Sequence, residues 1–278
     1  MASIYRSEAG QQLVRRWCAD QLDRWPVPHE RTTVAAAEAS THAVSAGSGP
    51  GTVVFVAGTN FNASSSLPLA TALVEAGHRV VLLDVPGQPG LSSGECPRGG
   101  LPWYGAWLSE ALEQLHTGRV TVLGHSLGAG IALSSESPLV DRLVLVSPGG
   151  LTRLRVTPKV LAASATWYLR PTEAHSARLL RAMHAPGHEP RAELVEWMTL
   201  IARHARSSAS PGKAPLPSTP RQSLAVVGEH DTFMPPRILA PAVRTAVGTD
   251  LHVIADAGHL VVEEHPQLVA GLVDTVTP

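Results

Sequence analysis

The 278-residue chain contains only two cysteines, Cys18 and Cys96. Two cysteines make no disulfide framework and do not have the spacing of metal ligands, so we interpret both as free thiols, buried or at the surface. Apolar runs of the about 20 residues that cross a bilayer are also missing, and the first residues lack the apolar stretch of a secretion signal. These absences predict a cytoplasmic protein with no metal site and no membrane partner.

The chain also has almost no excess of positive or negative charge. The formal net charge is −1 at pH 7, which argues against a nucleic-acid partner. The charge is uneven, however, because residues 151–216 hold ten Lys or Arg and only four acidic residues. This local excess describes either solvated helix faces or a segment that attracts an anionic substrate, a carrier-bound acyl group or an acidic partner.

A length of 278 residues suits one large domain or a core with an insertion, and hydrophobic residues, at 44% of the chain, are enough for a sizeable buried core. Residues 7–25 have the pattern of an amphipathic helix, which the Trp-Pro-Val-Pro segment at residues 25–28 ends. We expect residues 1–50 to provide this helix and a lead-in strand, both packed on the core.

Apolar, β-branched runs alternate with helical patterns from residue 51 onward. The predicted strands are residues 52–57, 79–84, 119–123, 142–147, 223–227 and 251–254, and the predicted helices are residues 67–76, 103–115 and 266–273. Such alternation predicts an α/β fold with a mainly parallel central sheet that helices cover on both faces. Ligands of such sheets bind at the carboxyl ends of the strands.

The alternation stops between residues 149 and 220, where helical periodicity replaces the strands. Two apolar stripes have helical spacing: Leu179, Leu180 and Met183, and then Leu194, Trp197, Met198 and Ile201. We therefore predict a helical lid over residues 151–216, inserted between two core segments, residues 51–150 and 217–278. The polar, proline-rich return at residues 207–217 predicts no regular structure.

The segment Gly124-His125-Ser126-Leu127-Gly128 follows an apolar strand pattern and leads into a run of small residues. This order predicts a strand, a tight turn and a helix, with Ser126 at the apex of the turn. The glycines two residues before and two residues after the serine let the strand and the helix pack closely. The pentapeptide is frequent by chance, so its context decides its meaning.

A serine hydroxyl needs a base that takes its proton, and the base needs a third group that fixes its tautomer. His259 follows the predicted strand at residues 251–254, and Asp231 follows the one at residues 223–227. Both therefore belong to the edge of the sheet where ligands bind. The order along the chain is Ser126, Asp231, His259.

Other residues compete for these roles. Glu229 and Asp256 are acids near the same loops, but Asp256 lies too close in the sequence to the candidate histidine. His265 lies at the start of a helix, where a solvent-facing role is favoured. His125 lies beside the serine on a turn that points neighbouring side chains apart, so we assign it a supporting role.

With these three motifs in this order after successive strands, the core of the chain resembles the α/β-hydrolase superfamily. The resemblance covers the sequence from about residue 51 to the end. It implies an α/β-hydrolase fold with a helical lid insertion, in which Ser126 is the nucleophile, Asp231 the orienting acid and His259 the general base and later the general acid.

The resemblance also implies two donors for a developing oxyanion. One is the backbone N–H of Leu127, and the other comes from the loop after the strand at residues 52–57. We assign the second donor to Thr59, with Asn60 as the alternative. Many members of the superfamily have His-Gly where this chain has Ala57-Gly58, and the assignment of the second donor depends on that loop.

Apolar and aromatic residues are candidates for the substrate pocket. They are Phe61, His125, Trp167, Tyr168, Met183, Trp197, Met198 and Leu260. For the lid residues, packing inside the protein is the competing explanation. If they line the site, the sequence predicts an apolar pocket for an acyl or alcohol group.

A serine nucleophile favours acyl transfer through an acyl-enzyme, with carboxylic esters as the default substrate. The N-terminal helix and the helical lid are similar to those of a group of bacterial carboxylesterases. We therefore predict a serine ester hydrolase for small-molecule ester or acyl substrates, with no cofactor, because no glycine-rich phosphate loop accompanies the strands. A thioesterase, C–C bond hydrolase, acyltransferase or cyclase would use the same residues, and a non-enzymatic ligand-binding relative is the third class.

Overall fold

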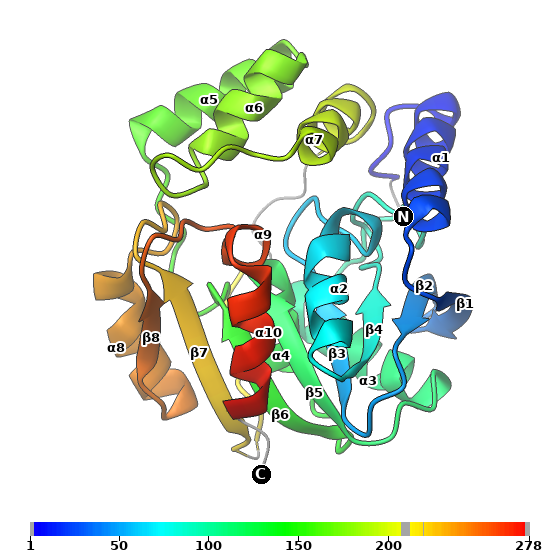
Figure 1. Cartoon of the computed structure of the whole chain (residues 1–278), viewed down its shortest axis with the longest axis vertical. Coiled ribbons are helices and arrows are strands. Elements are labelled where there is room, and N and C mark those ends of the chain that lie inside the picture. Colours follow the sequence, from blue (N-terminus) through cyan, green and yellow to red (C-terminus); the bar gives the residue numbers. More distant parts are fainter. Residues whose placement is uncertain (1–2, 207–211, 219, 276–278) are drawn as a thin grey trace.

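The computed structural model describes residues 3–206, 212–218 and 220–275. Its centre is an eight-stranded sheet with the order β1-β2-β4-β3-β5-β6-β7-β8 (Figure 1). The strands are β1 (His29–Ala36), β2 (Ala39–Ala46), β3 (Thr52–Val56), β4 (Arg79–Leu83), β5 (Val120–His125), β6 (Val140–Val146), β7 (Gln222–Gly228) and β8 (Leu251–Ile254). In this order, each pair of neighbouring strands from β4 and β3 to β7 and β8 is parallel, which confirms the mainly parallel sheet predicted from the sequence.

The sheet begins with an antiparallel hairpin where the sequence predicts one lead-in strand. β1 and β2 pair along their whole length, and β2 then pairs antiparallel with β4. The hairpin turns through Ala37 and Glu38, which both have positive φ angles, 47° and 61°. Asn-Gly or Asp-Gly is the usual signal for such a turn, so Ala-Glu at this position concealed the second strand.

Helices cover both faces of the sheet. They are α2 (Leu67–Glu75), α3 (Gly100–Gln114), α4 (Leu127–Ser134), α8 (Pro236–Val247) and α10 (Pro266–Thr275). Side chains of α2 and α10 belong to one hydrophobic cluster, and those of α3, α4 and α8 belong to another. Val53 and Phe55 of β3 enter the first cluster and Val54 the second, because successive strand residues point to opposite faces.

Three helices lie between β6 and β7 in the sequence and above the carboxyl ends of the strands (Figure 1). They are α5 (Pro158–Leu169), α6 (Glu173–Arg181) and α7 (Ala192–His204). Thr157 and Thr172 cap α5 and α6 by accepting hydrogen bonds from backbone N–H groups of the first turn. We call residues 151–206 and 212–216 the insertion; residues 207–211 of the predicted lid lie outside the described residues.

The N-terminal helix α1 (Glu8–Arg24) packs against the insertion as well as the core. The rings of Trp17 on α1 and Trp197 on α7 lie 4.8 Å apart. The chain before α1 also exchanges backbone hydrogen bonds with the end of α7, from Arg6 to His204 and from Arg206 to Ile4. These contacts tie α7 to the rest of the protein. Among the described residues, no helix combines the length and apolar character that crossing a bilayer requires.

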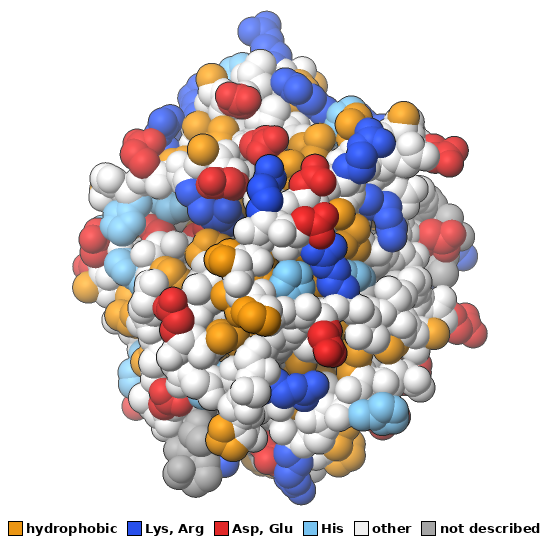
Figure 2. Space-filling view, turned by 45° about the vertical axis from the view of Figure 1, so that its right-hand side comes forward, with side chains coloured by type: hydrophobic (Ala, Val, Ile, Leu, Met, Phe, Trp, Pro, Cys, Tyr) orange, Lys and Arg blue, Asp and Glu red, His pale blue; other side chains and the backbone are white. Residues whose placement is uncertain are grey.

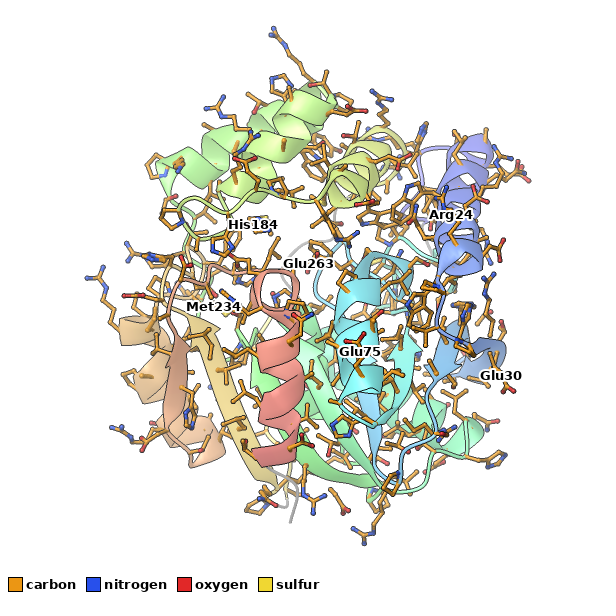
Figure 3. All side chains as sticks on the ribbon, viewed as in Figure 1. Arg24, Glu30, Glu75, His184, Met234 and Glu263 are labelled. Carbon is orange, nitrogen blue, oxygen red and sulfur yellow. The ribbon has the colours of Figure 1, made fainter. Side chains whose placement is uncertain are left out.

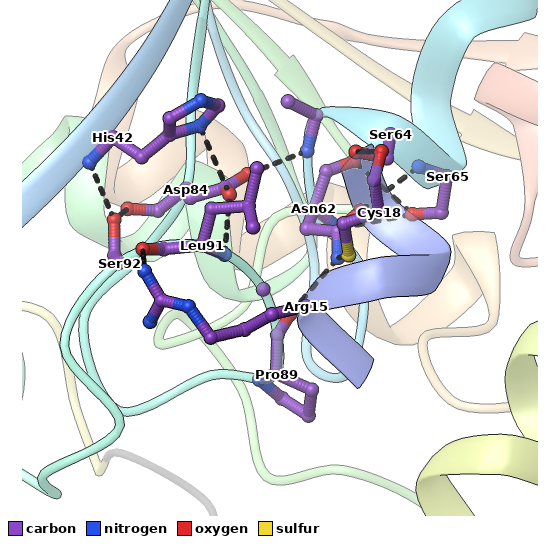
Figure 4. A network of polar contacts seen from close by, with 12 residues as sticks. Arg15, Cys18, His42, Asn62, Ser64, Ser65, Asp84, Pro89, Leu91 and Ser92 are labelled. Carbon is purple, nitrogen blue, oxygen red and sulfur yellow. Dashed lines mark hydrogen bonds and ion pairs between the residues drawn. The ribbon is translucent and has the colours of Figure 1, made fainter. Parts of the chain in front are cut away.

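A buried network of polar contacts holds the loop that follows β3 (Figure 4). The Asp84 carboxylate accepts hydrogen bonds from the backbone N–H groups of Ala63 and Leu91, each at 2.8 Å. The Asn62 side chain donates to the carbonyl of Pro89 at 3.1 Å. The loop after β3 and the segment around Leu91 are thereby both fixed to the Asp84 carboxylate, which follows β4 at the carboxyl ends of the strands.

Both cysteines are free thiols. Cys96 is exposed, whereas Cys18 is buried, and its sulfur accepts a hydrogen bond from the Asn62 amide at 3.3 Å. Burial raises the pKa of the Cys18 thiol well above its usual range, so the thiol stays protonated.

Gly128, in the first turn of α4, touches the backbone of β3. A methyl group added there would overlap the carbonyl oxygen of Val56, whereas one added at Gly271 of α10 would meet nothing within 4 Å. We expect Gly128→Ala to lower the free energy of unfolding by about 3 kcal/mol or more, since the backbone must move. Gly271→Ala should leave it unchanged or raise it by up to about 1 kcal/mol. Urea unfolding of both variants tests this, and equal stabilities would contradict the close packing of α4 on β3.

Candidate active site

Ser126 lies at a strained turn between β5 and α4. Its φ and ψ angles are 53° and −109°, a conformation that non-glycine residues rarely adopt. A Cβ at Gly124 would lie 2.6 Å from the backbone of Ala129, so only glycine lets the helix turn back this closely. The turn holds a half-buried Ser126 side chain at the carboxyl end of β5.

His259 lies between Ser126 and Asp231. Its Nε2 atom is 3.2 Å from the Ser126 Oγ, and its Nδ1 atom is 2.9 Å from the Asp231 Oδ2. Because a carboxylate only accepts hydrogen bonds, Nδ1 carries the proton, and the free lone pair of Nε2 faces the serine hydroxyl. The structure thus brings together the three residues that the sequence singles out, on the loops after β5, β7 and β8.

Asp231 is buried and is held by its own loop. Its Oδ1 atom accepts hydrogen bonds from the backbone N–H groups of Phe233 at 2.9 Å and Met234 at 2.8 Å. Burial by itself would raise the pKa of Asp231, but attraction to His259 and the hydrogen bonds from the His259 ring and the Met234 N–H outweigh it and lower the pKa to about 2. The carboxylate is therefore charged at neutral pH.

The other acids and the other histidine that compete for the roles of Asp231 and His259 make different contacts. Asp256 is exposed and pairs with His188 at 3.0 Å. Glu229 is also exposed and lies 3.9 Å from its neighbour His230. The His265 ring bonds to the backbone carbonyl of Asp256 at 2.7 Å. Within the described structure, Asp231 is the acid that reaches the His259 ring.

His125 supports the loop of His259. Its Nε2 atom donates a hydrogen bond of 2.9 Å to the backbone carbonyl of His259. Burial, followed by repulsion from the His259 ring, lowers the pKa of His125 to about 3. The ring is therefore neutral at physiological pH and fixes the backbone next to the site.

Glu264, on α9 (Val261–Glu264), was missed by the sequence reasoning. Its buried carboxylate accepts hydrogen bonds from the backbone N–H of Gly258 at 2.8 Å and of Ala185 at 2.6 Å. The backbone N–H of His259 in turn donates to Met183 at 2.7 Å. Glu264 thus joins the loop of His259 to the insertion. No motif marks it, because an acid in a short helix usually faces solvent.

Figure 3 shows the region where the insertion meets the ends of the strands, with His184, Met234 and Glu263 labelled. Arg191 precedes α7 and forms an ion pair of 2.8 Å with Glu263. It also donates a hydrogen bond to the Ser65 carbonyl. These contacts hold the insertion against α9 and the loop after β3.

The candidate oxyanion donors line the cavity next to Ser126. Within the described residues, the backbone N–H groups of Thr59 and Leu127 donate no hydrogen bond to the protein. The backbone N–H of Asn60, the alternative donor, is engaged by the Gln88 side chain at 2.9 Å. This difference favours Thr59 over Asn60 as the second donor.

A cavity of about 500 Å³ opens above Ser126, between the strand ends and the insertion. Its wall includes six of the predicted pocket residues: Phe61, His125, Trp167, Tyr168, Met183 and Met198. It also includes residues that the sequence does not assign to the pocket: Leu154, Leu161, Leu179, Phe233 and Met234. The wall is therefore largely apolar, with its polar groups near Ser126.

Two predicted pocket residues do not reach this wall. Trp197 packs on Trp17, and its indole N–H donates to the Asn60 carbonyl at 2.8 Å. Leu260 is buried and lines a separate small hollow together with Phe55. Helical spacing places Trp197 on the buried face of α7 but does not distinguish a packed side chain from one that lines a cavity.

As far as the structure describes the chain, the cavity wall carries no Lys, Arg, Asp or Glu. Two basic residues of the insertion that do not line it form ion pairs instead, Arg181 with Glu189 at 2.7 Å and Arg191 with Glu263 at 2.8 Å. Among the described residues, no group of three or more His, Cys, Asp or Glu side chains is arranged to hold a metal ion. The wall of the cavity therefore offers a bound molecule apolar contacts, with a few polar groups near Ser126.

The sequence of residues 53–272 matches a model of the alpha/beta hydrolase family. This range includes the loops of Ser126, Asp231 and His259, and it covers most of the chain. The protein therefore belongs to the alpha/beta hydrolase family.

Solved structures of similar fold include two Bacillus subtilis enzymes. Carboxylesterase CesB is 17% identical with a TM-score of 0.78, covering 96% of this chain and 98% of that one. Naproxen esterase (carboxylesterase NP) is 19% identical with a TM-score of 0.77, covering 95% and 96%. A third structure from the same organism is 19% identical, has a TM-score of 0.82 and covers 98% and 100%. At sequence identities below 20%, these structural similarities show a shared fold and nothing further.

Among curated sequences, a protein of Mycobacterium tuberculosis described as "Uncharacterized protein Rv2715" is 47% identical over 53 residues. The match spans 18% of this chain and 16% of the mycobacterial protein. The chain thus covers well under two thirds of that relative, and the similarity is local.

The low pKa of His125 makes stability depend on pH. Its folded-state pKa, about 3, lies below the ordinary value of 6.5, so the unfolded chain binds the extra proton between these two pH values. The free energy of unfolding therefore falls as pH falls through this window. We expect His125→Gln to reduce this fall, as measured by urea unfolding at about pH 7 and about pH 4.5.

The exposed His252 on β8 offers a matched control. His252→Gln should keep the pH dependence of the wild type. Identical pH dependence in the wild type and His125→Gln would contradict a neutral, buried His125.

Proposed function

We propose that the protein is a serine ester hydrolase that acts through an acyl-enzyme. The observation that carries this proposal is the His259 ring, which lies within hydrogen-bond distance of both the Ser126 hydroxyl and the buried Asp231 carboxylate at the floor of the cavity. A nucleophile, a base and a group that orients the base are the minimum that serine catalysis requires.

In the first step, the Ser126 Oγ attacks the carbonyl carbon of the ester while its proton passes to His259 Nε2. The charged Asp231 holds Nδ1–H and stabilises the imidazolium that forms. The carbonyl oxygen becomes an oxyanion and accepts hydrogen bonds from the backbone N–H groups of Thr59 and Leu127. The carbon–oxygen bond to the alcohol then breaks, and Nε2 returns the proton to the leaving oxygen.

In the second step, water takes the place of the alcohol. His259 Nε2 removes a proton from the water as it attacks the acyl carbon, and the second oxyanion uses the same two donors. The bond from the acyl carbon to Ser126 Oγ breaks, and the serine oxygen recovers the proton from Nε2. The acid leaves and the site returns to its starting state.

The uncharged wall supports neutral esters with an apolar acyl or alcohol group. An anionic group inside the cavity would lose its hydration without gaining a cationic partner. Two structural neighbours, carboxylesterase CesB and naproxen esterase, support ester hydrolysis as the reaction class. We therefore place an anionic or carrier-bound acyl substrate second.

Hydrolysis of p-nitrophenyl esters from acetate to decanoate tests the proposal. We expect turnover by the wild type and a loss of roughly 10⁴-fold or more in Ser126→Ala, because members of a catalytic triad act as one unit. A matched pair of neutral and carboxylate-bearing esters should favour the neutral one. Unchanged turnover in Ser126→Ala would contradict the assigned nucleophile.

The acid is tested by exchanging a carboxylate for an amide at two positions. Asp231→Asn should lower kcat by roughly 10⁴-fold, by analogy with serine proteases, because the amide can stabilise the wrong histidine tautomer. Asp256→Asn, an exposed control on the loop of His259, should stay near wild type. An active Asp231→Asn beside an inactive Asp256→Asn would assign the role to Asp256 instead.

A further inference from the structure

The outer face of α5 is apolar. The helix packs through Val160, Ala163 and Trp167, which are buried. On its other faces Leu161 is 61% exposed and Leu169 is 77% exposed. A surface helix of a globular protein normally turns charged and polar residues outward, so α5 departs from the usual pattern.

The loop before α5 has the same character. Leu154 is 44% exposed and Val156 is 55% exposed. Together with Leu161, Tyr168 and Leu169, these side chains make up half of the large exposed hydrophobic residues of the described structure. A gathering of exposed apolar side chains within one short segment marks an interaction site.

Four cations are interleaved with these apolar side chains. They are Arg153, Arg155, Lys159 and Arg170, all of them exposed. The sequence contains no acidic residue between Asp141 and Glu173. Across the part of the chain that the structure describes, none of the four cations forms an ion pair. We call residues 153–170 the α5 surface.

The α5 surface is continuous with the mouth of the cavity. Leu154, Leu161 and Tyr168 belong both to the exposed set and to the cavity wall. In Figure 1, α5 lies at the end of the molecule opposite the C-terminus. In Figure 2, most of the visible Lys and Arg side chains lie in the upper half, which the insertion shares with α1, and acidic side chains accompany them on that face.

We propose that the α5 surface docks on an anionic lipid surface. Exposed apolar side chains suit the boundary between headgroups and acyl chains, and cations that form no ion pair with the described residues suit anionic headgroups. An acidic protein would match the cations but would leave Leu169 and Val156 without a hydrocarbon layer to enter. The proposal departs from the sequence-based expectation of no membrane partner.

Docking through the α5 surface turns the mouth of the cavity toward the lipid. An amphiphilic ester could then pass from the lipid layer to Ser126 with little exposure of its chain to water. This consequence rests on the proposed ester hydrolysis, whereas the docking itself does not.

Vesicle co-sedimentation of the full chain tests the docking without any turnover. The probes are phosphatidylcholine vesicles with and without phosphatidylglycerol. Val156→Ser/Leu169→Ser removes two exposed apolar side chains that do not line the cavity, and Arg153→Gln/Arg155→Gln removes two cations. Ile238→Ser/Leu268→Ser is the matched control, since both side chains are exposed on other helices.

We expect the wild type and the control to bind the anionic vesicles and to be released by salt. Loss of each cation should weaken binding roughly fivefold, and the two serine substitutions should weaken it by about tenfold or more. Hydrolysis of soluble p-nitrophenyl acetate by the Val156→Ser/Leu169→Ser variant should equal that of the wild type. This assay separates a failure of docking from a failure of the proposed function.

Three results would overturn the docking proposal. The first is no binding of the wild type to anionic vesicles. The second is equal binding by the wild type and the α5-surface variants. The third is self-association of the wild type in sedimentation velocity, abolished by Val156→Ser/Leu169→Ser, together with no binding of the protein to vesicles. That result would make the α5 surface an interface between two copies of the chain.

Discussion

The hydrogen bond between His259 and the buried Asp231 carboxylate is the interaction on which the site depends. It fixes the imidazole so that Nε2 faces Ser126 at 3.2 Å. Much of the surrounding structure serves this arrangement, because Asp231 is held by backbone N–H groups and the His259 loop is held by His125 and Glu264. The burial that by itself would raise the pKa of Asp231 is offset by the charge and hydrogen bonds around its carboxylate.

The parallel sheet could be predicted from the sequence because β3, β4 and β5 are buried on both faces and read as continuous apolar runs. The Ser126 turn could be predicted because its glycines are required by close backbone contacts. The β1–β2 hairpin could not, since β1 is largely exposed and its turn lacks glycine. Glu264 and the separation of Trp197 from the cavity depend on long-range packing, which leaves no local sequence pattern.

The insertion combines two kinds of apolar residue that have the same appearance in the sequence. Met183, Met198 and Trp167 point into the protein and line the cavity wall, whereas Val156 and Leu169 point to solvent. The basic excess of the insertion has a similar division. Arg181 and Arg191 are paired with acids, while the cations of the α5 surface form no ion pair with any described residue. The structure thus separates an uncharged cavity from a cationic, apolar rim within one segment.

The most direct test of the central claim is covalent labelling of the folded protein with a fluorophosphonate, followed by mass spectrometry of its peptides. A serine hydroxyl reacts with such a probe only where a base activates it and donors stabilise the phosphoryl oxygen. We expect a single adduct, on the Ser126 hydroxyl. An adduct on another residue, or no adduct in protein that is folded by circular dichroism, would contradict it.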